Sequence, residues 1–181
     1  MTVVAPGHAP EKYFGARDAF LRYAHESLDR DNLPVTVQPL TVDQPAELTY
    51  TDEDTLARAR LLIESARALR PDATFLVAAE EGLGEVRADG ETRHLVKTWA
   101  VVEILGLDPE ARLQAWGCSG GLQIPSALLD PSAGSPPWTP TTRRGGGMMK
   151  SVTQSTETRR SSTALATFLA LSSLLYGRVT G

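Results

Sequence analysis

The stretch between Thr51 and Gly84 constrains the fold of this chain most, because it encodes a helix, a turn and a strand in succession. Thr51 is of a type that caps helices, and three acidic residues follow it where the helix dipole favours negative charge. Pro71 ends the helix, because it disfavours the α conformation of the residue before it. Apolar residues recur between them at helical spacing and predict one buried stripe, made of Leu56, Ala59, Leu62, Ile63, Ala66 and Leu69.

A strand and two acidic residues complete this stretch. Residues 73–79 are a nearly continuous apolar run, which is typical of a strand covered on both faces. Glu80, Glu81 and Gly82 follow directly, so we expect the strand to end there. Because ligands of α/β sheets bind outside the carboxyl ends of strands, the two acids are candidate site residues. A solvated turn is the alternative.

A second candidate site lies near the start of the chain. Residues 2–5 predict a strand, Gly7 lies in a turn, and residues 11–29 predict a helix. A helix that begins after such a turn can bind phosphate through its backbone N–H groups and its dipole. Lys12, in the first turn of the helix, would add a positive charge. The alternative is a strand–turn–helix unit that binds nothing.

The remaining segments predict further elements around this centre. An Asp-Gly turn at Asp89 indicates a β-hairpin whose second arm spans residues 94–104. Strands and helices that alternate in this way predict a single α/β domain over residues 1–181, with a mixed central sheet flanked by helices. The last helix should bury Leu165, Phe168, Leu169 and Leu175 and end at Gly177. We also expect Trp99 and Trp116 in the sheet core, strands at 35–42 and 113–118, helices at 123–129 and 158–176, and a flexible loop at 130–147.

Composition narrows the classes of function. The net charge is −4, which argues against a general binder of nucleic acids or anionic membranes. Cys118 is the only cysteine, so neither an intrachain disulfide nor a cysteine-cluster metal site is available. The start of the sequence lacks the pattern of a signal peptide, and the most apolar segment, 164–176, is shorter than the ~20 residues that span a bilayer. We therefore expect a cytoplasmic protein.

Several segments occur in the order found in one enzyme family. The matching segments are the start of the central helix, residues 51–55; its Ala-Arg run, 57–60; the strand that ends in Glu80-Glu81-Gly82; the Trp99 strand; the turn at 121–125; and Thr158-Arg159-Arg160-Ser161. With them, nearly the whole chain resembles the non-canonical purine nucleoside triphosphate phosphatases, also called inosine/xanthosine triphosphatases. The resemblance implies hydrolysis of inosine or xanthosine triphosphate to the diphosphate and phosphate, with Mg²⁺ or Mn²⁺. Members of the family are often dimers, so it also implies a homodimer.

The resemblance implies a set of site residues. Glu80 would be one metal ligand, and Glu47 in the loop before the central helix the second, with Asp43 as the alternative if that loop is shifted. Lys12 would be the catalytic lysine that pairs with phosphate oxygens. The other substrate-binding residues would be Gly7, His8, Glu80, Glu81 and Arg159.

This chain departs from the family pattern at the phosphate. The family's first turn reads Thr-Thr-Asn-Pro-x-Lys, whereas this chain keeps the proline and Lys12 but has neither the threonines nor the asparagine. The family's acidic Asp-Glu-x-Gly loop is also missing, and residues 130–147 stand in its place. Two alternatives to an inosine/xanthosine triphosphatase therefore stay open. One is a catalytically degenerate member that binds a nucleotide or a protein, and the other is a phosphatase of another small molecule.

Overall fold

The centre of the computed structural model is a six-stranded sheet with the strand order β2-β1-β3-β4-β5, in which β6 also pairs with β4. The structure describes residues 1–7, 9–30, 33–42, 49–106, 113–124 and 156–179, and the side chains of the last segment as far as Leu174. The elements in chain order are β1 (Thr2–Pro6), α1 (Pro10–Leu28), β2 (Thr36–Leu40), α2 (Asp52–Leu69), β3 (Phe75–Ala88), β4 (Glu91–Ile104), β5 (Leu113–Cys118), β6 (Leu122–Ile124) and α4 (Thr156–Val179).

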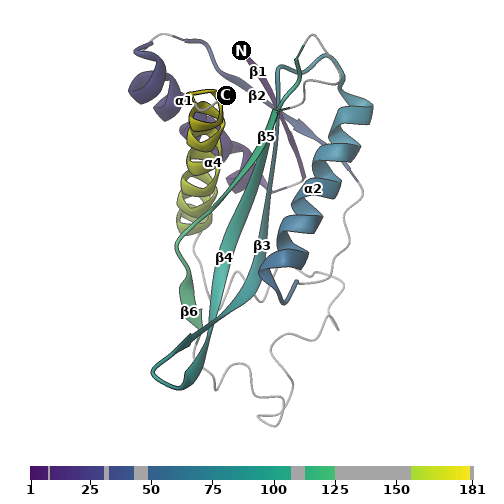
Figure 1. The fold of residues 1–181 in the computed structure, drawn as a ribbon. Coiled ribbons are helices and arrows are strands. Elements are labelled where there is room, and N and C mark those ends of the chain that lie inside the picture. Colours follow the sequence, from purple (N-terminus) through teal and green to yellow (C-terminus); the bar gives the residue numbers. More distant parts are fainter. Residues whose placement is uncertain (8, 31–32, 43–48, 107–112, 125–155, 180–181) are drawn as a thin grey trace.

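The sheet is mixed and lies between helices. Strand β1 runs parallel to β2 and β3, whereas β3–β4, β4–β5 and β4–β6 are antiparallel pairs. Helix α2 covers one face, and α1 and α4 lie together on the other (Figure 1). The predicted fold class, one α/β domain with a mixed sheet flanked by helices, is confirmed.

Burial on both faces explains the long apolar runs of the central strands. Successive side chains of a strand point to opposite faces, so each strand supplies both cores. The core under α2 contains Val4, Leu76 and Val101, and the core under α1 and α4 contains the next or preceding residue of each strand, Val3, Val77 and Val102.

The expected end of the strand at Glu80 is wrong. Strand β3 continues to Ala88 and pairs with β4 without interruption, from Phe75↔Ile104 to Ala88↔Glu91. The turn that ends it is Asp89-Gly90, with φ of 55° and 78°, the left-handed conformation that suits two-residue hairpins. Gly82 is therefore a strand residue. It is required there because a Cβ would overlap the hydroxyl groups of Thr49 and Thr55.

The buried face of the last helix also differs from the prediction. Leu165 and Leu169 are each 41% exposed, because α4 packs close to α1 and β5 at Gly15 and Gly117, where small side chains fit. Phe168 is partly buried under the Arg22 guanidinium group, and the side chain of Leu175 lies outside the described residues. The buried residues are Thr163, Ala166, Thr167, Ala170, Leu171 and Leu174.

Other predicted boundaries are corrected in detail. Helix α4 passes through Gly177 and does not end there, since a glycine within a helix costs only about 1 kcal/mol relative to alanine. Leu69, the last residue of α2, is 58% exposed. Trp116 is not in the core either: it is 49% exposed, with the Arg60 guanidinium group over its ring.

Predictions for residues 113–147 have mixed outcomes. Strand β5 matches the predicted strand at 113–118. The helix predicted from Gln123 is wrong at its start, since Gln123 and Ile124 pair with β4 as part of β6. The rest of that helix and the loop at 130–147 lie outside the described residues. Within the described part of the chain, no helix has the length and apolar character needed to cross a membrane.

Candidate functional site

The candidate site lies where β3 passes the end of β1. The two strands pair at Val3↔Phe75 and Val4↔Leu76, and β1 ends at Pro6, whereas β3 continues for many residues. Glu80 lies four residues beyond Leu76, next to the point at which the parallel part of the sheet ends. The sequence therefore located the acid correctly relative to the parallel strands, although β3 does not stop there.

Lys12 and Glu80 form an ion pair in this place. Lys12 Nζ lies 2.6 Å from Glu80 Oε1, and the two side chains are 11% and 9% exposed. Pro10 begins α1 and presets the backbone of its first turn, which projects Lys12 toward β3. The structure thus brings together the predicted catalytic lysine and the predicted metal ligand, with the two groups bound to each other.

Arg159 joins two further acids beside this pair. Its Nε donates to Glu81 Oε1 at 2.8 Å and to Oε2 at 3.0 Å, and its Nη1 donates to Glu11 Oε1. All three side chains are largely buried. Burial alone would lower the pKa of Arg159, but the hydrogen bonds and charges of Glu81 and Glu11 outweigh burial, so its pKa is raised. Glu11 was not predicted, since an acid in the first turn of a helix is common.

The charge of this cluster favours a cation. Glu11, Glu80 and Glu81 supply three carboxylates against the two positive charges of Lys12 and Arg159. Within the described residues no group of three or more acidic, histidine or cysteine side chains is placed to hold a metal ion by itself. Mg²⁺ commonly takes only one or two protein carboxylates and completes its shell with water and phosphate oxygens. Glu80 therefore fits as a single carboxylate ligand of Mg²⁺, once its ion pair with Lys12 is broken.

The first turn offers less to a phosphate than the sequence predicted. Gly7 has φ of 119°, and its N–H donates to the Leu40 carbonyl at 2.9 Å. This N–H is therefore already occupied and is not free to bind a phosphate oxygen. His8 lies outside the described residues.

The predicted second metal ligand, Glu47, comes two residues before Thr49, which pairs with β3. Glu47 and its alternative, Asp43, lie outside the described residues. Thr49 forms an isolated parallel bridge with Gly82, and its carbonyl accepts from Leu83 N at 3.0 Å. Thr49, two residues after Glu47 in the sequence, thus lies against β3 at a point two residues from Glu80.

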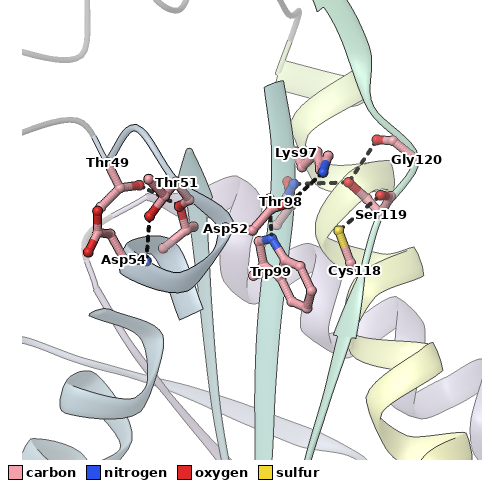
Figure 2. A network of polar contacts seen from close by, with 11 residues as sticks. Thr49, Thr51, Asp52, Asp54, Lys97, Thr98, Trp99, Cys118, Ser119 and Gly120 are labelled. Atoms are coloured by element: carbon pink, nitrogen blue, oxygen red, sulfur yellow. Dashed lines mark hydrogen bonds and ion pairs between the residues drawn. The ribbon is translucent and has the colours of Figure 1, made fainter. Parts of the chain in front are cut away.

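The sequence analysis missed a second lysine–carboxylate pair next to Glu80. Asp52, at the start of α2, accepts from Lys97 Nζ at 2.6 Å and from Trp99 Nε1 at 2.9 Å (Figure 2). Trp99 is the cross-strand partner of Glu80, so both side chains lie on the same face of the hairpin. Counting outward from the Asp89-Gly90 turn gives this pairing, and it is the signal by which the sequence could have located these residues.

Threonine hydroxyl groups fix the start of α2 against β3. Asp54 N donates to Thr51 Oγ1 at 3.0 Å, which confirms Thr51 as the N-cap (Figure 2). Thr55 Oγ1 donates to the Thr51 carbonyl at 2.7 Å and lies 2.6 Å from Thr49 Oγ1. Since the hydroxyl proton of Thr55 is used for Thr51, Thr49 donates to Thr55. The chain before α2 is therefore held against β3 by side-chain hydrogen bonds as well as by the bridge to Gly82.

Comparisons with known proteins show the fold. No family model matches the chain, and no curated protein matches its sequence. Among solved structures, it is similar to protein VC0702 from Vibrio cholerae, with a TM-score of 0.63 over 98% of this chain and 96% of that chain. The two sequences are 19% identical, so the likeness concerns the fold alone.

Proposed function

We propose that this chain is a metal-dependent nucleoside-triphosphate phosphatase that converts inosine or xanthosine triphosphate to the diphosphate and phosphate. The observation that carries the proposal is the buried pair of Lys12 and Glu80, at the point where β3 passes the end of β1. The choice of purine comes from the sequence resemblance to the inosine/xanthosine triphosphatases. The metal would be Mg²⁺ or Mn²⁺.

An exchange of partners explains how a buried ion pair could serve as a binding site. A phosphate oxygen would replace Glu80 as the partner of Lys12, and a divalent cation would replace Lys12 as the partner of Glu80. Leaving one member of a buried pair without its partner costs about 3–5 kcal/mol. Phosphate alone would leave Glu80 unpaired and metal alone would leave Lys12 unpaired, so each would bind with that penalty. A metal–triphosphate complex provides a partner for both groups. Binding of the two should therefore be strongly cooperative.

Each residue of the site would have a separate role in triphosphate hydrolysis. A bound divalent ion would neutralise phosphate charge and orient or activate a water molecule. Glu80 would hold this ion, and Glu47, two residues before the anchored Thr49, is our proposed second ligand. Lys12 would orient a phosphate oxygen. Trp99, opposite Glu80 on β4, would form the adjacent wall, held in place by Asp52.

A specific observation favours the degenerate alternative. The Gly7 N–H is already donated to Leu40, and the family's two threonines and asparagine are absent. A hydrogen bond to a charged group contributes roughly 1.5–3 kcal/mol, so losing two such bonds would weaken binding or turnover on the order of a hundredfold or more. In that case the chain binds a nucleotide or a protein without hydrolysing a triphosphate.

Phosphate release from a panel of inosine, xanthosine, guanosine and adenosine triphosphates, with and without Mg²⁺, tests the proposal. We expect Mg²⁺-dependent release from the first two, and a loss of on the order of a hundredfold or more in Glu80→Gln because the metal loses a charged ligand. Glu85→Gln is the matched control, since Glu85 lies on the same strand but is exposed beside His94. Activity that is unchanged in Glu80→Gln would remove Glu80 from the mechanism.

Stability must be measured in parallel, because Glu80→Gln leaves Lys12 buried without its counterion. We expect the free energy of unfolding to fall in Glu80→Gln and to recover in part in Lys12→Met/Glu80→Gln, which removes both charges. If the folded wild type binds triphosphate by calorimetry but releases no phosphate, the degenerate alternative replaces the enzyme. If it neither binds nor hydrolyses triphosphate, both the enzyme and the nucleotide-binding form of the alternative are rejected.

A further inference from the structure

We propose that Arg159 is a positioning residue, which sets the first turn of α1 against β3 so that Lys12 and Glu80 meet. Its role as a positioning residue for catalysis rests on the proposed function. The proposal assigns α4, at the far end of the sequence, a part in the site without any contact between Arg159 and the reacting groups.

The chain order of the partners carries this inference. Arg159 binds Glu11 on α1 and Glu81 on β3, and each of these is the immediate neighbour of one member of the Lys12–Glu80 pair. Adjacent residues of a strand point to opposite faces, so Arg159 holds β3 through Glu81 while Glu80 remains available to Lys12. By binding Glu11 and Glu81 at once, the Arg159 guanidinium group therefore fixes the distance between the first turn of α1 and β3, across which Lys12 and Glu80 pair.

The low exposure and the charges of Glu11 and Glu81 mean that the connection between α1 and β3 requires an arginine at position 159. The side chains of Glu11, Arg159 and Glu81 are 4%, 14% and 11% exposed, so water screens them little. Without Arg159, the two carboxylates would face each other with no positive charge between them, and repulsion would separate α1 from β3. A lysine carries the charge but lacks the planar fork that serves two carboxylates at once.

The next residue provides a matched control. Arg160 also connects α4 to α1, through two hydrogen bonds to Asp18 at 2.6 and 2.9 Å. Asp18 lies about two turns further along α1 than Glu11, and this pair is more exposed, at 38% and 33%. Arg159 and Arg160 thus make the same kind of contact between the same two helices, but Arg159 alone of the two binds β3 in the described contacts.

A mutant cycle on the full chain tests the proposal independently of catalysis. The coupling free energy between Lys12 and Glu80 is obtained from urea unfolding of the wild type, Lys12→Met, Glu80→Gln and the double variant. The same cycle is then repeated in the Arg159→Lys and Arg160→Lys backgrounds. We expect the coupling to be lost in Arg159→Lys and retained in Arg160→Lys. Equal coupling in the two backgrounds would overturn the proposal.

If Arg159→Lys does not fold, a second variant is used as the background for the same mutant cycle. Glu11→Gln/Arg159→Met/Glu81→Gln has no charge left in the triad, so it removes the connection without leaving unpaired carboxylates. The Lys12–Glu80 coupling should be lost in this background as well, and its persistence would also overturn the proposal.

Turnover separates the positioning role from the proposed function. With inosine triphosphate and Mg²⁺, we expect kcat/KM to fall at least tenfold in Arg159→Lys and to stay within twofold in Arg160→Lys. If the wild type does not turn over, the proposed function fails, while the cycle still decides whether Arg159 positions the pair. If the wild type turns over and the two variants are equally active, the positioning role is rejected and the proposed function stands.

Discussion

The pKa of the Cys118 thiol depends on its burial and on the charges of Lys97 and Asp52. Its thiol is half-buried and donates to the Ser119 carbonyl at 3.2 Å. Burial raises the pKa of Cys118 above its ordinary value of 9.0, the positive charge of Lys97 lowers it, and the negative charge of Asp52 raises it, with a net increase. The folded chain therefore gains stability from the neutral thiol below pH 9.0, and this gain is lost as the pH rises through the folded pKa.

At the scale of single residues, we predict that Lys97→Met raises the pKa of Cys118 further. The thiolate is the form that reacts with iodoacetamide, so alkylation of the folded variant at pH 8 should be slower than that of the wild type. The pH profile of the alkylation rate measures the shift. Arg87→Met, on the exposed part of β3, should leave the profile unchanged. The same profile in Lys97→Met and the wild type would show that Lys97 does not act on the thiol.

At the scale of elements, β3 depends on Gly82, which the sequence analysis placed at the end of the strand and which lies within it. A Cβ at Gly82 would overlap the hydroxyl groups of Thr49 and Thr55, which hold the chain before α2 against the strand. We predict that Gly82→Ala lowers the free energy of unfolding by about 1–3 kcal/mol, as expected of overpacking in a tight contact. Urea denaturation of the full chain measures it.

Gly120→Ala is the control for Gly82→Ala. A Cβ at Gly120 would meet no atom within 4 Å, so we expect a change within about 0.5 kcal/mol. If the two variants are equally stable, the close approach of Thr49 and Thr55 to β3 is not a constraint on the fold.

The same elements show what the sequence could predict. Periodicity and caps located α1, α2 and the hairpin turn, because these features are local. The apolar run ends at Ala79 and did not show that β3 continues past Glu81; that follows only from the pairing with β4, counted outward from the Asp89-Gly90 turn. Nor could local patterns show that Leu169 is exposed on α4, because the close approach that selects its buried face arises from a glycine of a different element, Gly117.

For the whole molecule, the central pair of the candidate site, Lys12 and Glu80, was predictable in its residues but not in its arrangement. Lys12 and Glu80 followed from the positions of a helix start and a buried strand, and the structure brings them together. Their mutual pairing, and the triad around Arg159, join segments up to 148 residues apart, so no spacing in the sequence could show them. That Gly7 donates its N–H to Leu40 likewise required the packing of β1 beside β2.

Helix α2 is tied to the sheet by an ion pair near each of its ends. Asp52 meets Lys97 at the first turn, and Arg67 meets Glu103 at the last. Glu103 is 1% exposed on β4, and it accepts from Arg67 Nε at 2.7 Å and from Arg67 Nη2 at 2.6 Å. Sequence analysis could not foresee this use of Arg67, which lies beside the apolar stripe of α2. The side chain of Glu103 is 1% exposed and that of Asp52 33%, so loss of the Arg67–Glu103 pair should affect the stability of the whole domain more.

The last prediction concerns this pair. Arg67→Met leaves Glu103 charged and buried, and we expect the free energy of unfolding to fall by about 3 kcal/mol, the lower end of the range for buried pairs, because Arg67 is 24% exposed. Arg67→Met/Glu103→Leu removes both charges and should recover most of that loss, since apolar replacement of a buried pair is often neutral. Arg93→Met, next to the exposed Glu91 at 3.7 Å, should change stability by less than about 0.5 kcal/mol. Urea unfolding compares the variants. A double variant no more stable than Arg67→Met would mean that the loss comes from the packing of the arginine stem on the sheet and not from the unpaired carboxylate.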